Sequence, residues 1–337
     1  MTKLSPTRPD GLVTPIGASK TPGLWSRIWP LLIGLMVTLS LVTASLFIGV
    51  YDLSSEGGRE MFLITRVPRT LALILSGASM AVVGLIMQLM TQNRFVEPST
   101  TGTIEWAGLG LILTYIFIPQ PSLMLRMIVA IVFALVGTII FFAFLQRVAL
   151  KSSLVVPIVG LMLGAVVGAV STFVALQADM LQNLGIWFAG SFTGVTRGRY
   201  ELLWIVAVTT IIVYFIADRF TVAGLGQEIA TSVGLNYRAV MIVGISIVAI
   251  TTGVVSVVVG SLPFLGLVVP NIVSMFRGDN LRTNLPWVVM VGIVVITLTD
   301  IIGRTIIMPF EIPVSMILGV LGATVFVYLI VRRGRRG

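Results

Sequence analysis

Long apolar segments separated by short polar breaks dominate this sequence. They fall near residues 30–50, 67–91, 99–118, 125–146, 154–178, 201–217, 239–260, 264–276, 287–307 and 312–331. A helix of about 20 apolar residues crosses the hydrocarbon core of a bilayer, where only helices or closed barrels satisfy the backbone. The pattern therefore predicts an all-α, multi-pass membrane protein with about ten spans. The segment 264–276 is short for a full crossing, and Gly266 and Pro270 interrupt it.

Composition supports a multi-pass membrane protein and excludes several kinds of functional site. Of the 337 residues, 57% are hydrophobic and 10% are charged, against about a quarter charged in soluble domains. The absence of Cys and His excludes thiolate or imidazole metal sites, disulfides and histidine-activated nucleophiles. No Gly-Lys pair occurs, so there is no phosphate-binding P-loop. We therefore expect no enzyme active site, metal site or cofactor, and any ATP and Mg²⁺ must be bound by a partner subunit.

The net charge of +9 follows from membrane topology and does not indicate a nucleic acid partner. Lys and Arg collect in the cytoplasmic loops of membrane proteins. With the amino terminus inside, the cytoplasmic side carries fifteen of these residues and the outer side seven. An even number of spans then places both termini in the cytoplasm. We expect a disordered cytoplasmic tail at 1–30, a ten-helix domain at 31–332 and a basic tail at 333–337, in a bacterial cell membrane.

A stretch between the sixth and seventh spans, 224–238, has the composition of a soluble segment. Residues Gln227–Val233 can form under two turns of helix, Glu228 lies near the positive N-terminal end, and Gly234 fits a left-handed C-terminal cap. An exposed short helix with a small apolar face can bind another protein, although an ordinary loop has similar signals. The residues assigned to this contact are Gly224, Gly226, Gln227, Glu228, Ile229, Ser232, Val233 and Gly234.

Arginines are frequent on the predicted outer side. Arg66 and Arg69 flank Val67-Pro68 at the start of the second span, and Arg304 lies near the end of the ninth. Arginine at a helix end commonly anchors in the headgroups. The alternative is a cationic rim that docks an acidic partner through paired guanidinium and carboxylate groups. Spacing alone favours anchoring. Asp300 precedes Arg304 by four residues, so the two can pair on one helix.

Glu105 is a carboxylate within an apolar span. Such a group is costly and usually faces a water-filled path or a partner. The alternative is that Glu105 lies close enough to the cytoplasmic end to be hydrated and to pair with Arg94 or Lys151.

Five motifs, in order along the chain, resemble one known family. They are RVPRTLALILSGASMAVVGLIMQ (66–88), LGQEIATSVGLN (225–236), FLGLVVPNI (264–272), TDIIGR (299–304) and EIPVSMILGVLGA (311–323). From about Arg66 to Arg332 the chain resembles the FecCD-type permease subunits of the iron-siderophore and cobalamin ABC importers, which are type II importers. It is more similar to the siderophore branch.

The resemblance implies ten transmembrane helices per subunit and two permease subunits, identical or related, around a central path. It also implies two ABC ATPase subunits in the cytoplasm and a substrate-binding protein outside. The segment 224–236 matches the loop that seats on the ATPase in this family. Arg66, Arg69 and Arg304 match arginines that meet acidic residues of the binding protein. The resemblance therefore favours docking of the binding protein over anchoring in the lipid headgroups.

The resemblance further implies a cytoplasmic gate after the second span. The family has Arg-Asn-Pro-Leu-Ala there, whereas this chain has Gln92–Val96. Asn93 and Phe95 occupy the gate positions, and the larger Phe without the preceding Pro alters the gate's shape. The residues assigned to the gate and translocation path are Asn93, Phe95, Glu105, Ser152 and Ser153.

The sequence therefore predicts the permease subunit of an ABC importer that moves a ferric siderophore from an extracytoplasmic binding protein into the cytoplasm. ATP hydrolysis resides on a separate subunit, and membrane lipid surrounds the chain. A cobalamin or haem importer of the same architecture is the first alternative. An ion-coupled secondary transporter is less favoured, because such carriers usually hold several ionisable groups in mid-membrane and this chain offers only Glu105 and Asp300.

Overall fold

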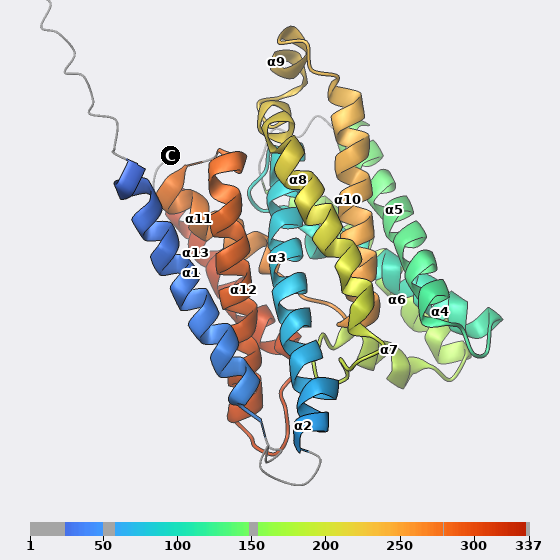
Figure 1. The fold of residues 1–337 in the computed structure, drawn as a ribbon. Helices are drawn as coiled ribbons and strands as arrows, with labels where there is room; N and C mark the ends of the chain where they lie inside the picture. Colours follow the sequence, from blue (N-terminus) through green and yellow to red (C-terminus); the bar gives the residue numbers. More distant parts are fainter. Residues whose placement is uncertain (1–23, 50–57, 148–153, 279, 335–337) are drawn as a thin grey trace, which may run out of the picture.

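The computed structural model describes residues 24–49, 58–147, 154–278 and 280–334, which form a helical bundle (Figure 1). The longer helices are α1 (Leu24–Phe47), α3 (Val67–Met90), α4 (Thr103–Phe117), α5 (Leu123–Arg147), α6 (Val155–Gln177), α8 (Trp204–Ala223), α10 (Tyr237–Val258), α11 (Leu265–Arg277), α12 (Leu281–Thr305) and α13 (Val314–Gly334). The short ones are α2 (Gly58–Met61), α7 (Leu181–Phe188), α9 (Gln227–Ser232), a π-helical turn at Phe62–Arg66 and 3₁₀ turns at Pro98–Thr100 and Tyr200–Leu203.

Helix length confirms the all-α, multi-pass fold. Within the described ranges, eight helices are long and apolar enough to cross a membrane. Helices α4 and α11 are shorter, with 15 and 13 residues. Each of the predicted apolar segments overlaps one of these ten helices. The short eighth segment corresponds to α11, which begins among buried residues inside the bundle.

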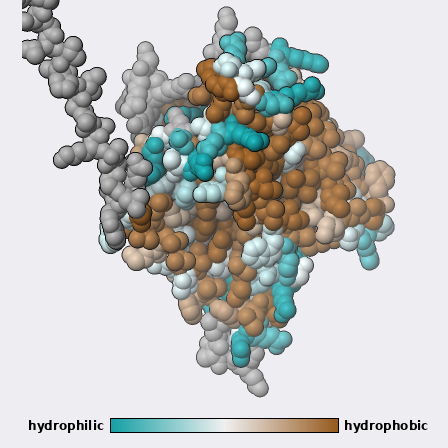
Figure 2. Space-filling view, turned by 45° about the horizontal axis from the view of Figure 1, so that its top comes forward, coloured by the Kyte–Doolittle hydropathy of each residue, from teal (hydrophilic) through white to brown (hydrophobic). Residues whose placement is uncertain are grey.

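The outer surface of the bundle is that of a membrane protein. Figure 2 shows a broad hydrophobic band with hydrophilic residues gathered at the ends. Large apolar side chains point outward along the helices, such as Phe215, 79% exposed, and Phe173, 61% exposed. An apolar surface of this extent is unfavourable in water and matches a lipid or protein environment.

The ends of the described chain lie on one side. Helix α1 begins, and α13 ends, at the end of the bundle that carries α9 (Figure 1). Residues 24–30, placed in the tail by the sequence, are helical in the structure. The reason is that no Gly or Pro occurs between Leu24 and Trp29, so helix can start directly after Pro22-Gly23. The segments 1–23 and 335–337 lie outside the described residues.

Small residues bring α3 and its neighbours into close contact. A Cβ on Gly77 would come within 2.9 Å of the Gly292 oxygen of α12, and one on Gly84 within 2.1 Å of the Gly266 oxygen. Gly160 of α6 faces the Thr100 oxygen in the same way, at 2.2 Å. Glycines at these positions allow the close helix contacts that membrane bundles favour. Gly168 and Gly319, also at packing intervals, meet no described atom within 4 Å.

Three non-helical segments meet inside the bundle, 91–102, 189–194 and 259–264. The Ser191 N–H donates to the Val259 oxygen at 3.0 Å, and the Ser315 N–H donates to the Gly190 oxygen at 3.1 Å. Irregular backbone at membrane depth is tolerated only where protein or a water-filled cavity surrounds it.

Candidate functional site

Helix α9 projects beyond the rest of the bundle (Figure 1). Gly226 (φ 106°) precedes it and Gly234 (φ 82°) follows it, both in backbone conformations that favour glycine. The Gly234 N–H donates to the Thr231 oxygen at 2.9 Å, and the Leu235 N–H donates to the Ala230 oxygen at 3.0 Å. This pair of bonds is a Schellman motif. The predicted short helix is confirmed and ends at Ser232. Val233 is its C-cap residue, and Gly234 after it has the predicted left-handed conformation.

The projecting helix exposes an apolar face. Ile229 and Val233 are 50% and 66% exposed, and Leu225 just before the helix is 59% exposed. Ala230 is fully buried and fixes the helix on the bundle. Exposed apolar residues that are grouped together and rimmed by polar ones mark a protein contact.

The coupling segment, residues 224–238, contacts the segment that follows α3. A Cβ on Gly226 would lie 2.8 Å from the Nε2 of Gln92, and one on Gly224 would lie 2.9 Å from the Cδ2 of Leu89. The glycines allow this approach, since a side chain at either position would collide with α3 or the residues after it. The start of the coupling segment therefore lies next to Leu89 and Gln92.

Residues 91–97 include the predicted gate positions and are here called the gate segment; several contacts hold this segment in place. The Asn93 side chain is buried and accepts a hydrogen bond from the Phe95 N–H at 2.9 Å. The Phe95 ring is also buried and packs edge-on against Phe326 of α13, with ring centroids 5.5 Å apart. From α11, Asn271 Nδ2 donates to the Arg94 oxygen at 2.8 Å. The larger Phe thus fills a space between the gate segment and α13. Ser152 and Ser153 lie outside the described residues.

Glu97 at the end of the gate segment is a site residue that sequence reasoning missed. It is fully buried, and its carboxylate accepts from the Phe264 N–H at 2.8 Å, from the Gly266 N–H at 3.1 Å and from the Ser99 hydroxyl. Phe264 and Gly266 stand at the N-terminal end of α11, where helix N–H groups lack partners and a negative charge is favourable. Glu97 falls in the short polar break between two apolar segments, so nothing in the sequence marked it as a buried acid.

Glu105 lies apart from this cluster, in the first turn of α4. Its Oε2 is buried and has no hydrogen-bond partner in the described part of the chain. A Cβ on Gly164 of α6 would lie 3.4 Å from that oxygen. Glu105 therefore faces α6, and the two interior carboxylates differ sharply, since Glu97 is fully hydrogen-bonded and Glu105 is not.

At the opposite end of the bundle, four charged residues form one network, here called the outer network: Arg69, Asp300, Arg304 and Glu311. Arg69 binds Glu311 with two parallel bonds of 2.9 and 2.8 Å, and it donates to Asp300 Oδ1 at 2.7 Å. Arg304 contacts Asp300 Oδ2 at 2.7 Å, which confirms the predicted pair four residues apart. Two cations and two anions balance, and Asp300 between them is fully buried.

The outer network extends to neighbouring segments. Arg304 donates to the Ser45 hydroxyl at 2.6 Å and to the Ile48 oxygen at 2.7 Å, at the end of α1. Arg66 donates to the oxygens of Leu46 and Phe47, both at 3.2 Å. The three predicted docking arginines thus lie at one end of the bundle. The side chains of Arg69 and Arg304 are only 14% and 6% exposed.

Glu311 joins this network to the segment 189–194. The Thr193 hydroxyl donates to its carboxylate at 2.6 Å. Burial raises the pKa of a carboxyl, but the bonds from Arg69 and Thr193 outweigh burial and hold the pKa of Glu311 below its ordinary value. Glu311 therefore stays charged at neutral pH and keeps the two segments joined.

Comparison with known proteins identifies the fold and its family. The model of the FecCD transport family matches residues 29–332. The chain belongs to the FecCD transport family. The petrobactin import system permease protein FatD of Bacillus anthracis is 55% identical, over 91% of this chain and 93% of that protein. YclN, the petrobactin import permease of Bacillus subtilis (strain 168), is 41% identical, over 88% of this chain and 96% of that protein.

Two more distant matches support the same family and fold. The ferric-anguibactin transport system permease FatD of Vibrio anguillarum is 33% identical, over 88% of this chain and 97% of that protein. Among solved structures, a transporter described as of the metal-chelate ABC type, in an inward-facing conformation, superposes with a TM-score of 0.78 at 22% identity, covering 90% of this chain and 99% of that one. The resemblance to the siderophore branch of the FecCD family is confirmed.

In this FecCD chain the predicted site residues fall in three places. Asn93 and Phe95 lie in the gate segment, next to the coupling segment 224–238. Arg69 and Arg304 share the outer network, and Arg66 lies beside it. Glu105 stands alone against α6.

The two interior acids give a matched test of the capping role. Glu97→Gln puts an amide N–H₂ against backbone N–H groups, so we expect the free energy of unfolding to fall by about 2 kcal/mol, because a buried N–H group loses its acceptor. Glu105→Gln should leave stability unchanged or raise it, because an unpaired buried charge is removed. Denaturant titration of the purified chain in detergent measures both. Equal effects would contradict the assignment of Glu97 as the cap of α11.

A second matched pair tests the outer network. Asp300→Asn leaves Arg69 and Arg304 short of a counter-charge, and we expect a loss of about 3–5 kcal/mol in unfolding free energy. Asp218→Asn breaks the exposed pair with Arg282, in which both side chains are about 60% exposed, and should cost less than about 1 kcal/mol. Thermal and denaturant unfolding compare the two. A loss as small for Asp300→Asn as for Asp218→Asn would show that the network carries no stability.

Proposed function

We propose that this chain is the membrane permease of an ABC importer that carries a ferric siderophore of the petrobactin class into the cytoplasm. The observation that carries the proposal is the projecting helix α9, whose exposed apolar face stands next to the gate segment, where Gly226 approaches the Gln92 side chain. The names of the FecCD relatives support a siderophore over cobalamin or haem. The chain is a transport subunit and not an enzyme, because ATP is hydrolysed by a separate subunit.

The proposed cycle transmits motion from the ATPase through α9. Closure of the ATPase dimer pushes on the face formed by Ile229 and Val233. The contact between Gly226 and Gln92 passes this push to the gate segment. That segment moves together with α11, through Glu97, and with α13, through the Phe95–Phe326 ring contact. The result is a path that opens towards one side of the membrane at a time.

A second permease completes the proposed path. Helices α6 and α13 offer exposed apolar faces, including Met162 at 66% and Val320 at 74% exposure. Such faces suit contact with a second permease, identical or related, as well as lipid. The iron travels as cargo with ligands supplied by the siderophore, so the path needs to accommodate an organic shell.

The outer end is the proposed dock for the substrate-binding protein, through Arg66, Arg69 and Arg304. Arg66 is half-buried and can meet an acidic partner directly. Arg69 and Arg304 act from beneath the surface by fixing Glu311 and the end of α1. Exposed Arg197 and Arg199 add positive charge at the same end.

The coupling role predicts the effect of charges on the apolar face. The double variant Ile229→Asp, Val233→Asp should bind the ATPase at least about tenfold more weakly, because each apolar side chain contributes about 1.5–3 kcal/mol when buried. Co-purification and titration with the ATPase measure the affinity. Leu181→Asp is the control, since Leu181 is 44% exposed on α7, at the other end. Normal ATPase binding by the double variant would overturn the assignment of α9.

The same proteins test transport. Proteoliposomes that hold the permease, the ATPase and the binding protein should take up radioactive iron as ferric petrobactin only when ATP is present. The double variant should take up none. Uptake by the permease alone under an ion gradient would favour the secondary transporter instead.

Docking predicts a salt-dependent effect at Arg66. Arg66→Glu should weaken binding of the cognate binding protein by about fivefold at low ionic strength, since an exposed ion pair contributes up to about 1 kcal/mol. The difference from the wild type should shrink as salt is raised. Arg147→Glu, the same charge change at the α9 end, is the control. An unchanged dissociation constant for Arg66→Glu at low salt would return Arg66 to headgroup anchoring.

A further inference from the structure

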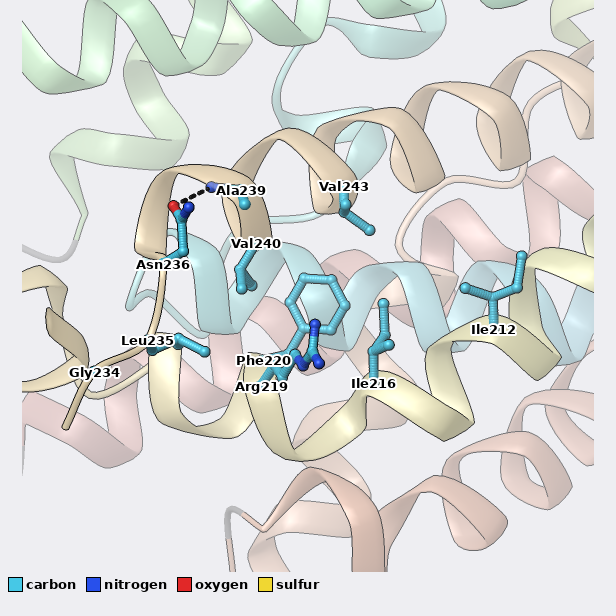
Figure 3. Close-up of a pocket in the computed structure, with 10 residues that line it drawn as sticks. All are labelled: Ile212, Ile216, Arg219, Phe220, Gly234, Leu235, Asn236, Ala239, Val240 and Val243. Atoms are coloured by element: carbon cyan, nitrogen blue, oxygen red, sulfur yellow. Dashed lines mark hydrogen bonds between the residues drawn. The ribbon is translucent and has the colours of Figure 1, made fainter.

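A groove of about 420 Å³ lies between α8 and α10, directly next to the end of the coupling segment (Figure 3). Its walls include Ile212, Ile216 and Arg219 on α8, and Asn236, Val240 and Val243 on α10. The spacing of three, four and seven residues places each set along one face of its helix. Ile212 and Val243 are 43% and 40% exposed, so the groove opens on the outside of the bundle.

Both walls change from apolar to polar in the same direction. Ile212 and Val243 lie towards the middle of the bundle, and Arg219 and Asn236 lie at the α9 end (Figure 3). Seven residues of helix span about 10 Å. The groove is therefore an apolar channel of about that length that ends in a cation and an amide. A phospholipid has the same order of groups, an acyl chain followed by a phosphate.

The polar end has unused binding capacity. No ion pair or hydrogen bond of Arg219 is found among the residues that the structure describes. The adjacent Asp218 is already paired with Arg282 of α12, so it is compensated elsewhere. The Asn236 Oδ1 accepts from the Ala239 N–H at 3.0 Å, which leaves the side-chain N–H₂ as a donor. The guanidinium of Arg219 is a fork-shaped donor that suits the oxygens of a phosphate.

Exposed apolar side chains beside the groove indicate that it faces lipid. The flanking side chains Phe215 and Ile242 are 79% and 56% exposed, as expected for a surface in contact with lipid. The α9 end is the cytoplasmic side under the positive-inside rule. Anionic lipids of the cytoplasmic leaflet are attracted to basic residues there.

We propose that this groove binds one anionic phospholipid, with its phosphate at Arg219 and an acyl chain between Ile216 and Val243. The groove wall continues into Gly234 and Leu235, which form the C-terminal cap of α9. The bound lipid therefore fixes the spacing of α8 and α10 at the base of the coupling helix. This role goes beyond transport of the substrate and does not depend on which chelate is carried.

Lipid retention tests the proposal directly. The assembled permease and ATPase, purified in detergent, are titrated with phosphatidylglycerol or phosphatidylcholine, and bound lipid is counted by native mass spectrometry. The wild type should retain one phosphatidylglycerol per permease in preference to phosphatidylcholine. Arg219→Gln should weaken this binding about fivefold, the equivalent of about 1 kcal/mol for one arginine near an anionic headgroup. Arg147→Gln, at the cytoplasmic end of α5, is the matched control and should bind as the wild type does.

A second variant tests the apolar part while the charge is kept. Val243→Trp fills the channel and should also expel the phosphatidylglycerol, although Arg219 is intact. Retention by both variants, or equal loss in Arg147→Gln, would overturn the proposal. If Val243→Trp instead releases the ATPase and leaves lipid retention unchanged, the groove is a seat for the ATPase and not for lipid.

Discussion

A helix that begins inside a bilayer leaves N–H groups without partners, and burial makes each of them costly. Helix α11 is such a helix, with 13 residues and a buried first turn. Glu97 meets this requirement from a segment far away in the chain, since it lies 167 residues before Phe264. The carboxylate satisfies two N–H groups and places its charge at the positive end of the helix. The interior of this permease depends on that contact.

The same contact makes the interior one mechanical unit. The gate segment is joined to α11 by Glu97 and Asn271, and to α13 by the ring contact of Phe95 with Phe326. It also touches the coupling segment where Gln92 approaches Gly226. Packed helices change position as units, because closely packed interiors do not deform continuously. In the proposed cycle, a push at α9 would therefore move the gate segment together with α11 and α13.

Sequence reasoning succeeded where the signal is local. The length of each apolar run predicted the helices, two glycines predicted the short α9 with its cap, and a spacing of four predicted the pair Asp300–Arg304. It missed what folding brings together from distant parts of the chain. Arg69 lies 231 residues before Asp300, so spacing could not show that the arginine has internal partners. Glu97 was missed for the same reason, because its partners are backbone N–H groups, which no residue type reveals.

In the proposed docking, the balance of charge in the outer network affects how readily the binding protein is released after each round of import. Arg69 and Arg304 keep their carboxylate neighbours on docking, so an acidic partner would pair mainly with Arg66 and gain little net free energy. A carrier protein that must leave after each delivery would benefit from such a small gain. Tight binding at this end would slow every later round, whereas a weak contact lets the emptied carrier depart.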